Sequence, residues 1–327
     1  MARVSVGVKE PLSRQQSVSL PSQPGQVRGL AGLAGDMMEV SPALMAFNFA
    51  YLASIWGVVV GAVALFWLEP AWYTLLVAVV LISSRQQALL NVEHEAIHKK
   101  FVRSRKWNDL IGRFACAAPV GSPYAASKER HLSHHRLLGT PEDPDHDLHA
   151  GPEKRTRAGL AKHFIGGLLG SYAGMILLGP KSPQVGRNPG AARHDLFAIL
   201  LLQAVLVTIF TVALEWWAYP LLWLAPLGTV TMLFHLVRSF VEHAISAGEE
   251  TEHSNRLITI RSNILERGLV APYGMNYHAE HHLLPTVPAP RLRALKHRLA
   301  GHEEIPPLLE RRSYGSALLG YVRALRS

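Results

Sequence analysis

Eight histidines in three short clusters place the strongest constraint on how this chain of 327 residues can fold. Residues three and four apart share one face of a helix, so each cluster can direct two or three imidazoles to one place. Imidazole suits zinc, copper, iron and nickel, and one structural metal uses about four ligands. The eight histidines therefore predict two metal ions, provided that the three clusters meet on one side of the protein. The clusters are His94 and His98; His131, His134 and His135; and His278, His281 and His282.

The composition indicates a membrane protein. The chain is 49% hydrophobic and 17% charged, which is too apolar for an ordinary soluble domain. Its single cysteine, Cys116, excludes an internal disulfide and a cysteine-ligated metal site. The net charge of +9 is typical of a membrane protein whose basic residues face the cytoplasm, and we expect no nucleic-acid partner.

Four apolar stretches predict membrane-spanning helices, because each approaches or exceeds the roughly 20 residues that cross a bilayer. Short turns at 68–71 and 215–219 join them into two hairpins. The stretches are Leu44–Trp67, Trp72–Ser84 with its continuation to the first cluster, Leu196–Leu214 and Pro220–Val237. A fifth apolar stretch, Phe164–Leu178, is too short for a comfortable span and predicts an interfacial or re-entrant helix.

The distribution of basic residues predicts the topology. Of the 33 Lys and Arg residues, 4 lie in 1–43, 16 in 93–194 and 11 in 244–327, while the two turns contain none. The positive-inside rule therefore places both turns outside the cell and both termini in the cytosol. Four spans also keep the three clusters on one side, whereas a fifth span would separate the third cluster from the others.

We therefore predict an all-α integral protein of the inner membrane, with four transmembrane helices in two hairpins and a cytosolic helical cap that carries the histidine boxes. Residues 1–40 are rich in Ser, Pro and Gln and predict a flexible N-terminal arm. Residues 41–300 form the four-span domain with its metal-binding cap, and residues 301–327 form a C-terminal tail.

The position of the clusters favours oxidation of a lipid over transport. None of the eight histidines lies in the middle of a span, where an ionisable residue would indicate an ion pathway. A metal site that caps apolar helices suits a lipid whose chain lies among those helices. Iron that activates dioxygen makes better use of many neutral ligands than redox-inert zinc does.

The boxes HxxxH, HxxHH and HxxHH, placed after two hairpins, resemble those of the membrane-bound fatty acid desaturase and hydroxylase superfamily. The segment 276–288 is especially similar to the third box of that family, and the first box with Phe101 and Asn108 behind it is similar too. The resemblance covers residues 44–300 and implies two iron ions, dioxygen as the oxidant and a fatty acyl or lipid substrate. The chain has no His-Pro-Gly-Gly of a fused cytochrome b5 and is similar to bacterial members. This implies a separate electron donor, either a ferredoxin-like protein with its reductase or a cytochrome.

The resemblance also implies a ninth metal ligand, His243, near the end of the fourth span. Animal stearoyl-CoA desaturases, which are only distantly similar, have a water-bridging Asn one turn earlier, where this chain has Ser239. The boxes leave the reaction open. We favour desaturation, while a hydroxylase, a carotenoid-type ketolase and a terminal-alkene-forming fatty acid decarboxylase share the same boxes. Outside enzymes, the alternative is a metal-binding membrane transporter.

Several acidic residues near the boxes have two interpretations. Asp143 and Asp145 follow the second cluster closely and either orient ligand imidazoles or cap their own turn. Glu95, Glu242 and Glu280 either accept hydrogen bonds from ligand imidazoles or lie on solvated helix faces. The pair His146 and His149 lies on a turn without helical pattern, so we expect it not to bind metal.

Overall fold

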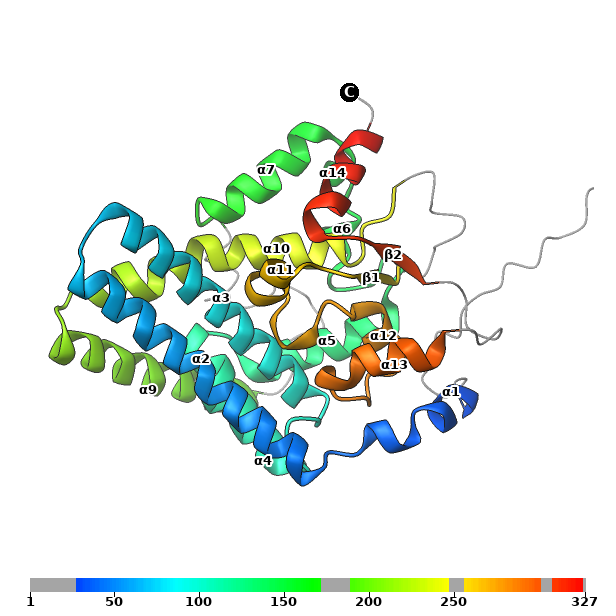
Figure 1. Cartoon of the computed structure of the whole chain (residues 1–327), viewed down its shortest axis with the longest axis horizontal. Helices are drawn as coiled ribbons and strands as arrows, with labels where there is room; N and C mark the ends of the chain where they lie inside the picture. The colour runs from blue at the N-terminus through cyan, green and yellow to red at the C-terminus, as the bar shows by residue number, and fades with distance from the viewer. Residues whose placement is uncertain (1–27, 172–188, 247–255, 301–307, 326–327) are drawn as a thin grey trace, which may run out of the picture.

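The computed structural model describes residues 28–171, 189–246, 256–300 and 308–325, and most of these residues are helical (Figure 1). The α-helices are α1 (Arg28–Leu33), α2 (Pro42–Leu68), α3 (Trp72–Ile97), α4 (Arg105–Leu110), α5 (Tyr124–Leu137), α6 (His146–His149), α7 (Arg157–Leu168), α9 (Pro189–Ala213), α10 (Met232–Val241), α11 (Ile264–Leu269), α12 (His278–Leu283), α13 (Leu292–Leu299) and α14 (Tyr314–Ala324). Short 3-10 helices lie at Gly35–Met38, Ala118–Val120, Pro152–Arg155, Pro272–Gly274 and Ala289–Arg291, and π-helical segments at Ile111–Ala117, Pro220–Leu224 and Leu227–Thr231.

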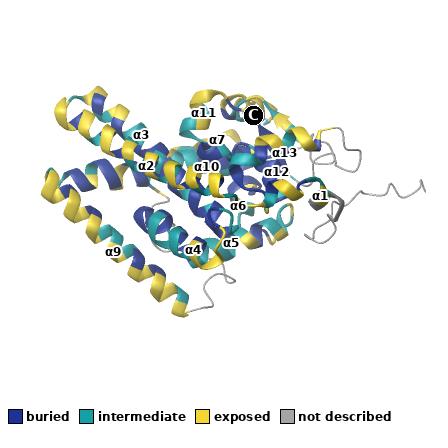
Figure 2. Cartoon of the chain, turned by 60° about the horizontal axis from the view of Figure 1, so that its bottom comes forward, coloured by how far each residue is buried: buried dark blue, intermediate teal, exposed yellow. Residues whose placement is uncertain are grey.

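Four helices in the described part of the chain are long and apolar enough to cross a membrane: α2, α3, α9 and the continuous helix Pro220–Val241, which ends in α10. This confirms the predicted four-span architecture. We call Pro220–Val241 the fourth span. Figure 2 shows that α2 and α9 are exposed along much of their length, and their exposed residues include Val60, Leu200 and Val212. Such long apolar surfaces are suited to contact with lipid chains.

The two hairpins are aligned, with their short turns at the same end of the bundle. Ser41 caps α2, because its hydroxyl accepts a hydrogen bond from Leu44 N at 3.2 Å, and Pro42 occupies the first helical position, which needs no amide hydrogen. At the far ends of the hairpins, the rings of Trp67 and Trp217 stack with centroids 5.7 Å apart. Both short turns therefore lie at one end of the bundle, on the left in Figure 1, and the cap lies at the other end.

Helix α3 runs without a break from the turn at 68–71 to the first histidine cluster. Beyond Arg85 it becomes polar and is fastened to the fourth span by buried hydrogen bonds. The amide of Gln86 donates to Trp223 O at 2.8 Å and accepts from the Thr231 hydroxyl at 2.6 Å. Pro226 interrupts the hydrogen bonding of the fourth span because it has no amide hydrogen, and the span is π-helical on both sides of it.

The cap contains one departure from the all-α prediction. Strands β1 (Ile258–Ile260) and β2 (Leu309–Arg311) pair in parallel, with Ile258 opposite Leu309. The described part of the predicted C-terminal tail thus forms β2 and α14. Helix α14 packs on α10, where the rings of Tyr321 and Phe240 meet edge to face at 4.8 Å. Residues 301–307 and 326–327 of the predicted tail lie outside the described part.

Two further predictions fall partly outside the described residues. Residues 28–40, the last part of the predicted arm, form α1 and a 3-10 turn, and the backbone of this segment accepts hydrogen bonds from Arg291 and Arg298. Residues 1–27 are outside the description. The predicted interfacial stretch begins in α7, whose Ile165 and Leu168 are exposed, whereas 172–178 is outside the description.

The topology can be tested by cysteine labelling in spheroplasts. Glu69 and Glu215 are exposed at the two turns, whereas Ala218 in the second turn is buried and unsuitable. Because the distribution of basic residues predicts that both turns lie outside, we expect an impermeant maleimide to label Glu69→Cys and Glu215→Cys in intact spheroplasts. The control Glu142→Cys, exposed in the cap, should react only after permeabilisation. Native Cys116 is buried and should give little background. Labelling of either turn only after permeabilisation would overturn the orientation.

Candidate metal centre

The nine histidines expected in the site converge from four parts of the fold: the end of α3, helix α5, the residues just after α10, and helix α12. They form two groups, and within each group the possible ligand nitrogens all lie within 4.8 Å of one another. We call these the five-histidine group and the four-histidine group. The first contains His94, His98, His131, His135 and His281, and the second contains His134, His243, His278 and His282.

The helical spacing explains how each HxxHH box serves both groups. Successive residues of a helix point about 100° apart, so on the shared face i+4 points about 40° to one side of i and i+3 about 60° to the other side, and i+3 can reach a different group from i and i+4. In α5, His131 and His135 join the five-histidine group and His134 joins the other. In α12 the assignment is reversed: His281 joins the five-histidine group, and the i, i+4 pair joins the four-histidine group.

The contacts between the imidazoles have the geometry of a metal coordination shell. In the five-histidine group, His131 Nε2 lies 2.7 Å from His98 Nε2 and 2.9 Å from His135 Nε2. In the four-histidine group, His243 Nε2 lies 3.2 Å from His134 Nε2 and 3.0 Å from His278 Nε2. Two nitrogens about 2.1 Å from one metal, in perpendicular directions, are about 3.0 Å apart. The residues therefore fit one metal ion in each group.

Burial keeps these imidazoles in the form that binds metal. Burial lowers the pKa of His98 to about 3, and burial together with the neighbouring imidazoles and Arg238 holds the pKa of His278 well below its usual range. His131, His135, His243, His281 and His282 have lowered pKa values for the same main reason. The lowered pKa values keep these seven imidazoles uncharged at neutral pH, and each of them has a nitrogen lone pair for a metal.

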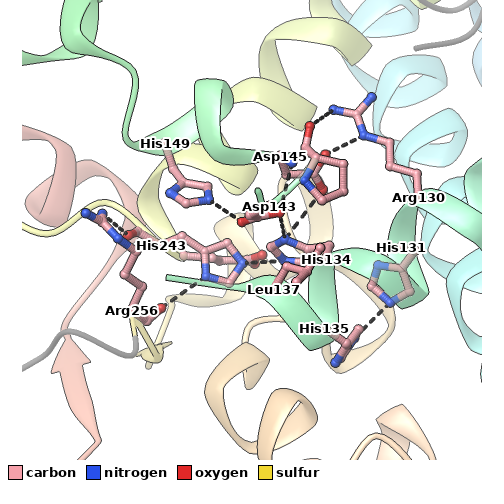
Figure 3. Close-up of polar contacts among 12 residues, drawn as sticks. Arg130, His131, His134, His135, Leu137, Asp143, Asp145, His149, His243 and Arg256 are labelled. Atoms are coloured by element: carbon pink, nitrogen blue, oxygen red, sulfur yellow. Dashed lines mark hydrogen bonds and ion pairs between the residues drawn. The ribbon is translucent and has the colours of Figure 1, made fainter. Parts of the chain in front are cut away.

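Asp143 lies between two histidines and contacts a member of the four-histidine group (Figure 3). Its Oδ1 is 2.8 Å from His134 Nδ1, and its Oδ2 is 3.1 Å from His149 Nε2. Burial raises the pKa of Asp143, but the hydrogen bonds with His134 and His149 outweigh that effect and lower it overall. Burial lowers the pKa of His134, but the hydrogen bond to Asp143 and the nearby carboxylate charges outweigh it and raise this pKa overall. An Nδ1–H that donates to Asp143 leaves the Nε2 lone pair of His134 directed at the four-histidine group.

The two interpretations of Asp143 and Asp145 are compatible, because the loop that carries them forms its own turn contacts and also contacts the four-histidine group. The amide of Asp145 donates to Asp143 Oδ1 at 2.9 Å, which is a local turn contact. The Asp145 carboxylate pairs with Arg130 of α5, and its Oδ2 lies 3.8 Å from His134 Nδ1. Arg130 thus links the loop to the helix that carries the second box (Figure 3).

A backbone carbonyl oxygen outside the histidine groups holds the ring of His243. Its Nδ1 donates to the carbonyl oxygen of Arg256 at 3.0 Å, which leaves Nε2 to face His134 (Figure 3). The same Nε2 also faces His278 Nε2. The residue follows α10 directly and is 3% exposed. The structure therefore brings the position implied by the resemblance next to the boxes.

The three glutamates beside the boxes are buried rather than solvated. Glu242 Oε2 lies 3.5 Å from His278 Nδ1, while its Oε1 accepts hydrogen bonds from Arg238 and from the Tyr314 hydroxyl. Glu95 accepts from the amide of Ala289, and Glu280 accepts from the Thr259 hydroxyl at 2.7 Å. Glu95 and Glu280 therefore link the boxes to neighbouring segments of the cap and do not contact a ligand imidazole.

His149 is the residue that sequence reasoning missed. It was expected not to bind metal because no helical pattern surrounds it, yet it lies in the short helix α6, is 1% exposed and could form a further metal group with His134 and Asp143. The HxxH spacing with His146 was the only available signal. Since Asp143 lies between it and His134, His149 is placed to orient that carboxylate.

A cavity of about 250 Å³ lies between α3, α5 and the fourth span and borders both histidine groups. His94 and His131 line it from the five-histidine group, and His134, His243 and His278 from the other. Ser239, one turn before His243, also lies in its wall. A molecule in this cavity would therefore lie beside both histidine groups.

Comparison with known proteins agrees with this geometry. The chain is 25% identical over 250 residues to dihydrorhizobitoxine desaturase of Bradyrhizobium elkanii, a match that covers 70% of this chain and 69% of the relative. It is also 25% identical over 206 residues to a beta-carotene ketolase of Paracoccus sp. (strain N81106 / MBIC 01143), covering 62% of this chain and 72% of the relative. The family model for fatty acid desaturases matches residues 70–307. The chain therefore belongs to the fatty acid desaturase family and is a membrane-bound oxidoreductase.

Proposed function

We propose that this protein uses two iron ions and dioxygen to oxidise an unactivated C–H bond in a fatty acyl or related lipid chain, and that the reaction is a desaturation. The observation that carries the proposal is the convergence of nine imidazoles into two groups beside one cavity. Iron suits nitrogen ligands of this kind and, unlike zinc, changes its oxidation state.

The protein contributes ligands, orientation and exclusion of water. The five-histidine group would hold one iron and the four-histidine group the other. Asp143 would fix the ring of His134, and Asp145 would support Asp143. Ser239 would contact the same site from the wall of the cavity. Bound iron would supply the reduction of dioxygen and the attack on the C–H bond, which no side chain of the chain can perform alone.

Desaturation removes two hydrogen atoms from adjacent carbons. With dioxygen, two electrons and two protons, these atoms leave as two molecules of water. The electrons would come from a separate donor, either a ferredoxin-like protein with its reductase or a cytochrome. The ketolase relatives favour oxygen insertion as the second candidate reaction on the same site. The distribution of basic residues supports a cytosolic site, where soluble donors are accessible.

Metal and product analysis of the purified full-length chain tests this function. We expect about two irons per chain, since each histidine group offers enough ligands for one ion. Cells that express the protein under ¹⁸O₂ should accumulate a lipid lighter by two hydrogens and without label, whereas a hydroxylase or ketolase would incorporate the label. A decarboxylase would release a hydrocarbon shorter by one carbon. Zinc in place of iron, with no oxygen-dependent product, would overturn the proposal.

The ninth ligand can be tested with one pair of histidine variants. We expect His243→Ala to lose the iron of the four-histidine group, leaving about one iron per chain, because only three imidazoles remain there. Turnover should fall nearly to zero. His297→Ala, on the exposed face of α13, is the matched control and should retain both irons. Full iron content and turnover in His243→Ala would remove this residue from the site.

The role of the acidic loop can be tested by exchanging a carboxylate for an amide. We expect Asp143→Asn to lower activity or iron affinity by about 10- to 100-fold, because an amide holds the His134 ring less firmly in the required tautomer. Asp147→Asn, an exposed change in the same loop, should behave as the wild type. Thermal unfolding will show whether both variants fold. Wild-type iron content and turnover in Asp143→Asn would mean that Asp143 only stabilises the turn.

A further inference from the structure

A short run of exposed residues, 103–107, lies a few residues after the first histidine box and leads into α4. Its sequence is Arg-Ser-Arg-Lys-Trp, and we call it the basic segment. All five residues are exposed, including Trp107, which is 59% exposed. The segment therefore presents three positive charges and a large aromatic ring at the surface of the protein.

Two of the three charges have no partner of opposite sign. Among the residues that the structure describes, the side chains of Arg105 and Lys106 form neither an ion pair nor a hydrogen bond. The acidic groups beside the segment are already paired. Glu39 pairs with Arg103 at 3.0 Å, and Asp109 of α4 pairs with two lysines outside the segment. The described part of the chain thus leaves an excess of positive charge on this surface.

Contacts with α2 fix the depth of the basic segment in the membrane. The 27 residues of α2 extend over about 40 Å, which exceeds a hydrocarbon core of about 30 Å, so the ends of the helix reach the lipid headgroups. Just before the segment, Phe101 O accepts from the Asn48 side-chain amide, two turns into α2, at 2.8 Å. Arg103 Nε then donates to Val40 O, which precedes α2, at 2.8 Å. The segment therefore begins at the headgroup level on the cap side.

The chain returns to the helical bundle directly after the basic segment. Helix α4 continues into the π-helical segment Ile111–Ala117, and beyond it Pro119 O accepts from the indole N–H of Trp223 at 2.9 Å. Trp223 belongs to the fourth span and is fully buried. The basic segment thus lies between α3 and a second element that enters the bundle, and both hold it at the membrane surface.

We propose that the basic segment binds anionic glycerophospholipids of the leaflet on the cap side, with their phosphates at Arg105 and Lys106. Basic residues next to a span attract anionic lipids, and tryptophan prefers the interface between lipid and water, where the Trp107 ring lies. An acidic soluble protein would match the charge but not the depth, because lipid headgroups occupy this level. The inference concerns a surface outside the metal centre and does not depend on the proposed oxidation.

Quenching of Trp107 fluorescence by brominated lipids tests the inference. The full-length chain is reconstituted in phosphatidylcholine vesicles that contain a rising fraction of phosphatidylglycerol with brominated chains or, in the matched series, of phosphatidylcholine with the same chains. The difference between the wild type and Trp107→Phe isolates the signal of this ring. We expect half-maximal quenching at a mole fraction at least about fivefold lower for the anionic lipid, because one base near an anionic surface contributes about 1 kcal/mol, which is about fivefold in affinity.

Salt and charge variants locate the effect. Because salt screens exposed charges, the preference for the anionic lipid should fall to about twofold or less in about 1 M NaCl. We expect the same fall when Arg105→Gln is combined with Lys106→Gln. The matched control combines Arg293→Gln with Arg312→Gln, which removes two exposed charges elsewhere on the cap and should keep the wild-type preference. This control separates the segment from the net charge of the protein.

Equal quenching of the wild type by the two lipids would overturn the inference. An unchanged preference in the Arg105 and Lys106 variant would overturn it too, and so would an unchanged preference in high salt. Turnover with a [2Fe–2S] ferredoxin and its reductase tests the competing occupant. Slower ferredoxin-dependent turnover of the variant, with its lipid preference intact, would assign the surface to an electron donor instead. Loss of the lipid preference with wild-type iron content would support the lipid site and show that it is separate from the metal centre.

Discussion

The structure depends on bringing nine imidazole nitrogens into two small volumes. Neutral imidazoles in this arrangement cannot satisfy one another, because His134 and His243 donate outward from Nδ1 and direct only their Nε2 lone pairs at each other. The arrangement is favourable only when a cation accepts the lone pairs, and it requires every contributing helix to be fixed in rotation as well as in position. Much of the surrounding fold supplies that fixation: the buried glutamates beside the boxes, the acidic loop and the polar contacts between α3 and the fourth span.

The spans and the boxes could be predicted from the sequence because both depend on local patterns. Charge-free length identified the two hairpins, and the spacing of His131, His134 and His135 placed these rings on one helix. The absence of basic residues from the turns pointed to one common end, where Trp67 and Trp217 in fact stack. In each case the property that decides the structure is contained in a short segment.

Other features depend on contacts between distant segments and could not be predicted. The division into five and four histidines depends on how the end of α3, α5, α12 and the residues after α10 come together, which no single segment specifies. The burial of Glu280 depends on Thr259, and the role of His149 depends on Asp143. The parallel pair β1 and β2 joins segments about fifty residues apart, each only three residues long, so neither gives a periodic signal.

Because α3 is unbroken, an insertion or deletion within it would displace the histidines at its end. This helix forms a span, one wall of the cavity and the first two histidines of the site. One residue inserted anywhere between Trp72 and His94 would turn the first box by about 100° and shift it by about 1.5 Å relative to the rest of the helix. The turn at 68–71 has no such coupling, because a longer loop there leaves α3 in place. Insertions and deletions should therefore accumulate at the two short turns of this protein, while the distance from the membrane surface to its candidate metal centre stays fixed.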